Sequence, residues 1–227
     1  VRFRDREYLP QEVSAFILAE LKAQAERFLG EPVHDAVITV PAYFKDPQRG
    51  ATEDAAAMAK LNVKQLLNEP TAAAVCFGAA QIADGRQHLY GVYDLGGGTF
   101  DVSIIEVGGG AGGNVSIVGT GGDPRLGGGD FDDAITKWVL GEIQKRHSVD
   151  LSRDAAACAR IKAEAEARKR ELSAANTAMI NLPFLTPTLS VNLTISRAVF
   201  NSLIAPLLRR SLECFAGAIE SSEATRS

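Results

Sequence analysis

The 227-residue sequence has few of the side chains that build redox centres and His-dependent catalytic sites. Its three cysteines, Cys76, Cys158 and Cys214, lie far apart and show no Cys-x-x-Cys spacing. We therefore expect small buried thiols rather than a disulfide framework or a cysteine metal site. The three histidines are scattered, so no Ser/His/Asp arrangement can be built from them.

Long apolar runs and an excess of basic charge are also absent. No stretch approaches the length of a membrane span, the first residues lack the apolar core of a signal peptide, and a net charge of −4 does not suggest nucleic-acid binding. A hydrophobic content of 46% and a charged content of 23% are ordinary for one large or two small globular domains. These features predict a protein of the reducing cytoplasm. Because the chain has no initiator methionine and ends in a polar tail, we expect a fragment.

The most informative stretch is residues 93–103, which read YDLGGGTFDVS. An apolar run ends in Asp94, three glycines and Thr99 follow, and a second β-rich run begins at Phe100. Glycine tolerates the backbone conformations of a tight turn and lets a ligand come close. The pattern predicts two strands joined by a glycine turn, with Asp94 before the turn and Asp101 after it.

This turn suits a phosphate together with a metal ion. Successive N–H groups in a glycine turn form a concavity that attracts anions. Asp94 and Asp101 cannot bind phosphate directly, but they can hold the water shell of a Mg²⁺ ion that bridges phosphates. A glycine-rich hairpin with two solvated aspartates is the plain alternative for three glycines alone.

The first part of the chain predicts an α/β pattern. Apolar residues at helical spacing (13, 17, 21, 25 and 28) predict a helix over residues 10–29 that buries this stripe and ends at Gly30. The expected elements after it are a strand at 36–40, a helix from 46 to about 61, a strand at 63–67, a helix from Asn68 to 78 and a polar turn at 83–87.

Further strands and charged helices are expected after residue 88. The strands are predicted at 89–94, 100–107 and 114–119, with glycine-rich loops at 108–113 and 121–129. Asp130 is expected to cap the next helix, and a long charged helix is predicted at 154–173. Strands at 176–185 and 189–195 follow, and Ser196 should cap a last helix that Pro206 breaks or restarts.

Residues 93–103 resemble the second phosphate-binding motif of the actin-like ATPases, most closely that of the 70-kDa heat-shock chaperone (Hsp70) family. Two further strings are similar to the same family: VITVPAYF at 37–44, followed by Asp46, Gln48 and Arg49, and NEPTAAA at 68–74. A fourth similarity lies in the charged helix. These matches are collinear, and the resemblance runs from about residue 10 to about residue 211.

The resemblance implies an α/β protein with the actin-like ATPase (ribonuclease-H-like) fold, in which two lobes enclose a nucleotide. The fold would be incomplete here, with the end of the first lobe and much of the second. Residues 1–80 would belong to the first lobe, 81–129 to the start of the second-lobe core, 130–195 to its peripheral subdomain and 196–227 to helices that return toward that core.

The resemblance also implies that the chain binds ATP or ADP with Mg²⁺, and K⁺ as a further cation. It assigns residues to this binding. Asp94 and Asp101 would organise these cations around the phosphates, Thr99 would contact the γ-phosphate region, and Glu69 would lie near the attacking water. Phosphoryl transfer needs positioning and charge neutralisation more than covalent chemistry, which fits such a set. The backbone that would hold phosphate oxygens is that of Gly96, Gly97 and Gly98.

Two other groups of residues take their roles from the family. Glu166, Lys169, Arg170 and Ser173 would contact adenosine, and their i, i+3, i+4 and i+7 spacing places them on one helical stripe. Spacing alone fits a solvated charged face equally well. The group that would relay the nucleotide state to a peptide-binding domain is Pro41, Arg49 and Glu69; without the resemblance, Pro41 ends a strand and Arg49 is a helix-surface charge.

The sequence also departs from the family. Lys45, Cys76-Phe77, Pro124-Arg125 and Gly129 stand where other residues are common, which puts contacts at the cleft edge and with exchange factors in doubt. The first phosphate motif, the catalytic lysine that follows it, the late Gly-Gly adenosine motif and the peptide-binding domain are not found in these 227 residues. We therefore expect weak or no ATP hydrolysis by this chain alone.

Three functions remain open from the sequence. The leading one is the ATP-binding and ATP-hydrolysing domain of a chaperone that captures unfolded peptides with a J-domain co-chaperone and a nucleotide exchange factor, without nucleic acid or membrane. The second is a degenerate module that binds nucleotide or partners without turnover. The third is a sugar or acetate kinase of the same superfold, which the NEPT and VPAYF strings disfavour.

Overall fold

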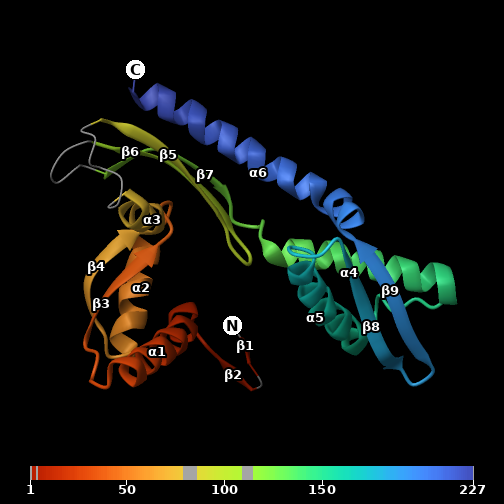
Figure 1. Ribbon diagram of the computed structural model, residues 1–227. Coiled ribbons are helices and arrows are strands. Elements are labelled where there is room, and N and C mark those ends of the chain that lie inside the picture. The colour runs from red at the N-terminus through yellow and green to blue at the C-terminus, as the bar shows by residue number, and fades with distance from the viewer. Residues whose placement is uncertain (1, 4, 79–85, 109–114, 227) are drawn as a thin grey trace. The chain divides into compact units, whose positions relative to one another are not determined.

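A computed structural model describes residues 2–3, 5–78, 86–108 and 115–226 (Figure 1). The chain divides into two compact units, each considered by itself below. The first consists of residues 1–92, 103–120 and 225–227, and the second of residues 93–102 and 121–224. None of the helices in the described ranges is long and apolar enough to cross a membrane.

The first unit begins with helices and strands in alternation, as the sequence predicts. Its elements are β1 (Arg2–Phe3), β2 (Arg6–Glu7), α1 (Pro10–Leu29), β3 (Asp35–Val40), α2 (Asp46–Met58), β4 (Asn62–Asn68) and α3 (Glu69–Gly78). Strands β3 and β4 are parallel, with Val40 opposite Asn68. α2 is shorter than expected, and α1 ends as predicted at Gly30, whose φ is 76°.

The predicted buried face of α1 is wrong. Ile17, Leu21 and Phe28 are 60%, 54% and 90% exposed, whereas Ala15 is buried. Leu18 instead packs against the small cluster formed by α2 and the β3–β4 pair. Within the described residues this sheet has two strands, which cover only part of an apolar helix face. A cavity of about 420 Å³ opens between α1 and β3.

A three-stranded sheet follows in the order β5-β6-β7, formed by β5 (His88–Leu95), β6 (Phe100–Val107) and β7 (Val115–Asp123). Ile105 and Val107 pack with Ala74 of α3 in a second small core. β7 runs four residues beyond the predicted end at residue 119, because Gly121 and Gly122 belong to the strand and not to a loop. The expected loop at 108–113 and turn at 83–87 fall largely outside the described residues.

The second unit contains the largest core. Its other elements are α4 (Gly128–His147), α5 (Ala155–Glu171), β8 (Thr177–Thr186), β9 (Leu189–Ser196) and α6 (Arg197–Arg226). The antiparallel β8–β9 pair packs against the apolar sides of α4 and α5 (Figure 1). The fully buried side chains that join these elements include Ile135, Ile143, Ile161, Ile180 and Ile195.

Two predicted helix boundaries are wrong. Asp130 does not precede α4: the helix begins at Gly128, and the Asp130 carboxylate reaches back from the third position to accept the Gly127 N–H at 2.8 Å. Pro206 does not break α6, which continues through it. Proline removes one N–H within the helix, yet the helix is continuous from Arg197 to Arg226.

The cysteines are free, and none of them is fully buried, contrary to expectation. Cys76 is exposed, and Cys158 and Cys214 are intermediate. α3 packs through Ala74, and residues two apart in a helix point to nearly opposite sides. Cys76 therefore faces away from the core.

Candidate functional site

The glycine turn between β5 and β6 is docked onto the first turn of α4. Within the turn, the Gly96 N–H donates to the Thr99 carbonyl at 2.9 Å. The carbonyl of Gly96 accepts the N–H of Gly128 at 2.9 Å, and the carbonyl of Gly97 accepts the N–H of Gly129 at 2.8 Å. The first N–H groups of a helix have no acceptor within the helix. The glycine turn supplies carbonyl acceptors for two of them.

These two hydrogen bonds fix the direction of the turn's remaining N–H groups. The described chain has no cis peptide bond, and in a planar trans peptide the N–H points opposite to the C=O. Because the carbonyls of Gly96 and Gly97 face α4, the N–H groups of Gly97 and Gly98 face away from it. A methyl group built at Gly97 or Gly98 meets nothing within 4 Å. The turn therefore has two adjacent donors on the side away from α4, which is the arrangement of an anion site.

Two carboxylates flank these donors. Asp94 is exposed, whereas Asp101 is half-buried, and one of its oxygens, Oδ1, is buried without a hydrogen-bonding partner. The backbone of β7 encloses this oxygen, since a Cβ at Gly122 would lie 3.2 Å from it. Burial, and secondly the charge of Asp94, raise the pKa of Asp101, while a hydrogen bond from Thr99 acts in the opposite direction.

Two carboxylates beside N–H groups that can bind an anion suit a cation that is bridged to a phosphate. Two carboxylates plus phosphate oxygens and water are a common ligand set for Mg²⁺. Among the residues that the structure describes, no cluster of three or more His, Cys, Asp or Glu side chains could hold a metal by itself.

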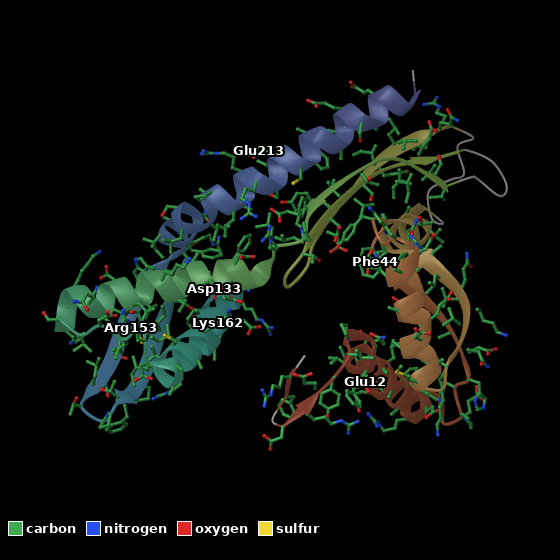
Figure 2. All side chains as sticks on the ribbon, turned by 180° about the vertical axis from the view of Figure 1, so that it is seen from behind. Glu12, Phe44, Asp133, Arg153, Lys162 and Glu213 are labelled. Carbon is green, nitrogen blue, oxygen red and sulfur yellow. The ribbon has the colours of Figure 1, made fainter. Side chains whose placement is uncertain are left out.

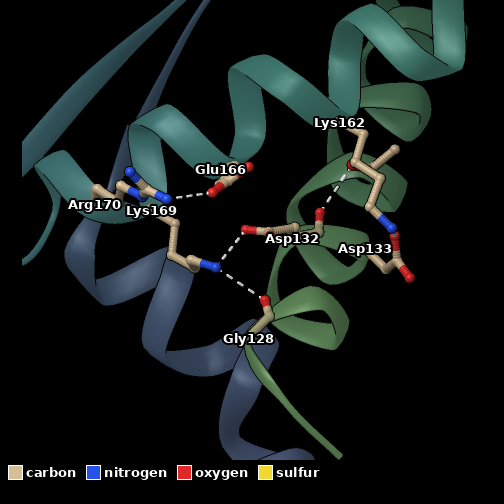
Figure 3. Close-up of polar contacts among 8 residues, drawn as sticks. Gly128, Asp132, Asp133, Lys162, Glu166, Lys169 and Arg170 are labelled. Carbon is tan, nitrogen blue, oxygen red and sulfur yellow. Dashed lines mark hydrogen bonds and ion pairs between the residues drawn. The ribbon is translucent and has the colours of Figure 1, made fainter. Parts of the chain in front are cut away.

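Lys169 of α5 binds α4 rather than standing free. Its ammonium lies 2.7 Å from Oδ1 of Asp132 and donates to the Gly128 carbonyl at 2.9 Å (Figure 3). The Asp132 side chain is only 9% exposed. Its Oδ1 has no geometrically sound hydrogen bond, so the nearby ammonium is what compensates its burial. Lys169 thereby fixes the helix turn that docks onto the glycine turn.

The other predicted adenosine residues make contacts different from those of Lys169. Glu166 and Arg170 form an ion pair with each other at 2.5 Å, next to Lys169 on α5 (Figure 3). Together with two alanines they line an open cavity of about 370 Å³. Ser173 is exposed and follows the end of α5, where its carbonyl accepts from Arg197 at 3.3 Å. Of the four predicted residues, Lys169 is the one whose side chain is directed at α4.

The three predicted relay residues all lie at one end of the parallel pair in the first unit. Pro41 directly follows β3, and Glu69 directly follows β4. Arg49 links the same region, because its guanidinium donates to the Phe44 carbonyl at 3.0 Å and to the Asn68 side chain at 2.5 Å. Arg49 is therefore a structural link rather than a free surface charge. The carboxyl ends of parallel strands are a common place for ligand sites.

The comparison with known protein families supports the same interpretation. A family model described as Hsp70 protein matches residues 1–227, the whole chain. The chain belongs to the Hsp70 family. Hsp70 proteins have the actin-like ATPase fold and bind ATP and ADP with Mg²⁺, and the mixed α/β structure with small sheets agrees with an Hsp70-type nucleotide-binding domain.

Two residues beside the candidate turn were not singled out from the sequence. Asp132 compensates Lys169, and Gly127 lies against the glycine turn. In the first unit, the sequence indicated Asn68 only as a helix cap, whereas its side chain accepts from Arg49. Arg210 reaches the loop before α4 from a distant helix. The only signal in the sequence was the string GGGDFDD at 127–133. Asp130 in this string is recognisable as a helix cap, whereas the pairing of Asp132 with Lys169 is not.

Replacing Asp101 with asparagine is expected to raise the melting temperature of the ligand-free chain at pH 7. A raised pKa means that the folded state favours the protonated carboxyl. The stability that the protonated Asp101 contributes is therefore complete when the pH is below the carboxyl's ordinary pKa of 3.8. It is lost as the pH rises through the pKa of Asp101 in the folded state. Thermal unfolding of both proteins between pH 3.5 and 8 measures this difference, which should vanish at the acidic end. A constant difference across that range would contradict it.

Proposed function

We propose that this chain binds Mg²⁺-ATP and Mg²⁺-ADP at the glycine turn, as the nucleotide-binding part of an Hsp70-type chaperone. The observation that carries the proposal is the pair of N–H groups at Gly97 and Gly98, directed away from α4 and flanked by Asp94 and Asp101. This arrangement joins an anion site to a cation site within one short turn. In the intact protein, nucleotide state would control the capture of unfolded peptides.

Each residue of the turn has a distinct task in this proposal. The N–H groups of Gly97 and Gly98 orient phosphate oxygens, and Gly96 closes the turn through its bond to Thr99. Asp94 and Asp101 would hold Mg²⁺ through its water shell, and K⁺ would be a second cation near the same carboxylates. The bound Mg²⁺ would neutralise charge that develops on the transferring phosphoryl group.

The nucleoside end of the ligand is assigned to α5. Arg170 offers a planar guanidinium that can stack on adenine, while Glu166 and the exposed Ser173 can accept or donate hydrogen bonds to ribose. Lys169 contributes by holding the first turn of α4, and thereby the backbone at Gly128.

Coupling to other parts of the chaperone is assigned to the first unit. Glu69 would orient the attacking water, and Pro41 and Arg49 would transmit the nucleotide state to a peptide-binding domain as a two-state element. A J-domain co-chaperone and a nucleotide exchange factor would act on this cycle. Free thiols at all three cysteines fit a cytoplasmic setting.

A second function is favoured by what these 227 residues contain. They carry one phosphate turn and no second motif with a catalytic lysine to oppose it, so the phosphates would be clamped from one side. We propose that the chain by itself binds nucleotide with little hydrolysis. Phosphate release measured alongside binding separates the two functions, because sustained turnover would support the first alone.

Saturating Mg²⁺-ADP is expected to stabilise the chain by roughly 2.7 kcal/mol at about a hundredfold the dissociation constant. Calorimetric unfolding with and without the nucleotide measures this shift. Asp94→Ala should reduce it strongly because the cation loses a ligand. Asp133→Ala removes the same charge from an exposed ion pair with Lys162 on the facing helix, at 2.7 Å (Figure 2), and should leave the shift unchanged.

A cooperative transition that does not move with Mg²⁺-ADP would refute nucleotide binding at this turn. Equal loss of the shift in Asp94→Ala and Asp133→Ala would instead indicate a general charge effect. Chelation of Mg²⁺ with EDTA should abolish the shift if the carboxylates act through the cation.

A further inference from the structure

The loop between β7 and α4 is tied to the long helix α6 by one arginine. Arg210 donates both to the Asp123 carboxylate and, at 3.3 Å, to the Arg125 carbonyl. The other oxygen of Asp123 accepts the Arg125 N–H at 2.9 Å. One guanidinium thus holds the last residue of β7 and the middle of the following loop, while Leu126 beyond them is fully buried.

The tied loop leads directly to the glycine turn. A Cβ at Gly127 would lie 2.4 Å from the N atom of Gly98 and 2.6 Å from the carbonyl carbon of Gly97. The next two residues, Gly128 and Gly129, donate the hydrogen bonds that orient the turn. A shift of the loop by a few tenths of an ångström would therefore displace the N–H groups of Gly97 and Gly98.

A second contact of α6 supports the same strand end. Cys214 lies one helical turn beyond Arg210, and its carbonyl is 2.8 Å from the position of a Cβ at Gly121. One face of α6 thus follows the chain from residue 121 to residue 125. The N–H of Arg125 and then the Arg210 guanidinium lower the pKa of Asp123, so both contacts favour the ionised carboxylate.

We propose that Arg210 is a positioning residue, which sets the nucleotide-binding turn by fixing residues 123–127 from α6. The sequence pattern assigns Arg210 no role. The loop that it contacts includes Pro124 and Arg125, where the chain departs from the family string. The inference rests on the proposed nucleotide function of the turn. It adds that affinity is controlled from a helix that contributes no atom to that turn.

Amide hydrogen exchange in the full chain tests the inference without any ligand. Arg210→Gln should speed exchange of the Gly128 and Gly129 amides about fivefold, because loss of a partly exposed charge pair loosens a local opening by that order. The amides of α5 should not change. Arg209→Gln is the matched control, since the neighbouring arginine makes none of these contacts, and it should leave exchange of the Gly128 and Gly129 amides unchanged.

Affinity for Mg²⁺-ADP, measured by titration calorimetry, gives the second readout. Arg210→Gln should weaken binding about fivefold while the melting temperature of the free chain stays nearly constant, which a merely structural role would not produce. Arg210→Lys should restore part of the affinity through Asp123 alone. Asp123→Asn should weaken binding as Arg210→Gln does, and the double variant should be no weaker than either single one.

Unchanged exchange at Gly128 and Gly129 in Arg210→Gln would overturn the inference. Faster exchange with unaltered affinity for Mg²⁺-ADP would overturn it too, because the Arg210 contacts would then not influence ligand binding. A wild-type chain that binds no Mg²⁺-ADP would defeat the proposed function and with it the claim on affinity, whereas the exchange rates would still decide whether Arg210 sets the turn.

Discussion

Replacing Lys169 with methionine is expected to lower the free energy of unfolding by about 3–5 kcal/mol, because it leaves the nearly buried carboxylate of Asp132 without its compensating charge. Methionine keeps much of the volume of the lysine stem, so the loss is electrostatic in origin. Chemical denaturation monitored by Trp138 fluorescence and by circular dichroism measures the change.

Two further variants identify the cause. Lys169→Met combined with Asp132→Asn should recover most of the lost stability, since the buried charge is removed together with its partner. Lys162→Met removes a lysine from the same helix, but its partner Asp133 is half exposed, so the change should stay within about 1 kcal/mol. Equal losses in Lys162→Met and Lys169→Met would show that the charge of α5, and not the buried pair, is responsible.

Gly127→Ala is expected to uncouple α4 from the glycine turn. The φ of Gly127 is −166°, which alanine adopts without strain, so the whole effect is steric. Its Cβ would lie 2.4 Å from the backbone N of Gly98, and backbone cannot rotate away as a side chain can. We expect a loss of about 1–3 kcal/mol in stability and a loss of Mg²⁺-ADP binding beyond detection by calorimetry.

The same helix offers a matched control. A Cβ at Gly141 meets nothing within 4 Å, and alanine is preferred over glycine inside a helix by about 0.5–1 kcal/mol. Gly141→Ala should therefore raise stability and leave binding intact. Wild-type affinity in Gly127→Ala would mean that the turn keeps its shape without close contact to α4.

The order of helices and strands could be predicted from the sequence because local signals agree with the packing. Gly30 ends α1, Asp154 caps α5 through the N–H of Ala157, and Ser196 accepts the N–H of Val199 at the start of α6. These signals depend on neighbours within a few residues. Such short-range chemistry is legible in one sequence.

Features that depend on distant partners could not be predicted. The spacing of Ile17, Leu21 and Phe28 indicates an apolar stripe, but spacing cannot tell how much sheet is present to cover it. Gly121 and Gly122 resemble loop residues, although they belong to β7. Their lack of a side chain is explained by Cys214 and Phe100, whose carbonyls lie too close for a Cβ.

For the candidate site, the sequence located the residues of the turn but not what holds them. Asp94, Thr99 and Asp101 are contiguous with the glycines, so one string reveals them together. Lys169 was assigned to the ligand by family resemblance, whereas its partner Asp132 lies on another helix. Pairings across elements are set by tertiary structure, which a single sequence does not encode in any local pattern.

The docking of the glycine turn onto α4 also has an electrical consequence. Aligned peptide dipoles leave about half a positive elementary charge at a helix N-terminus. Here the carbonyls of Gly96 and Gly97 accept the first N–H groups of α4, so their peptide units extend the column of dipoles in the same head-to-tail sense. Hydrogen-bonded chains of this kind polarise one another. The positive end of α4 is thereby extended to the N–H groups of Gly97 and Gly98, so an anion at the turn would be attracted by the terminus of a helix that it does not contact.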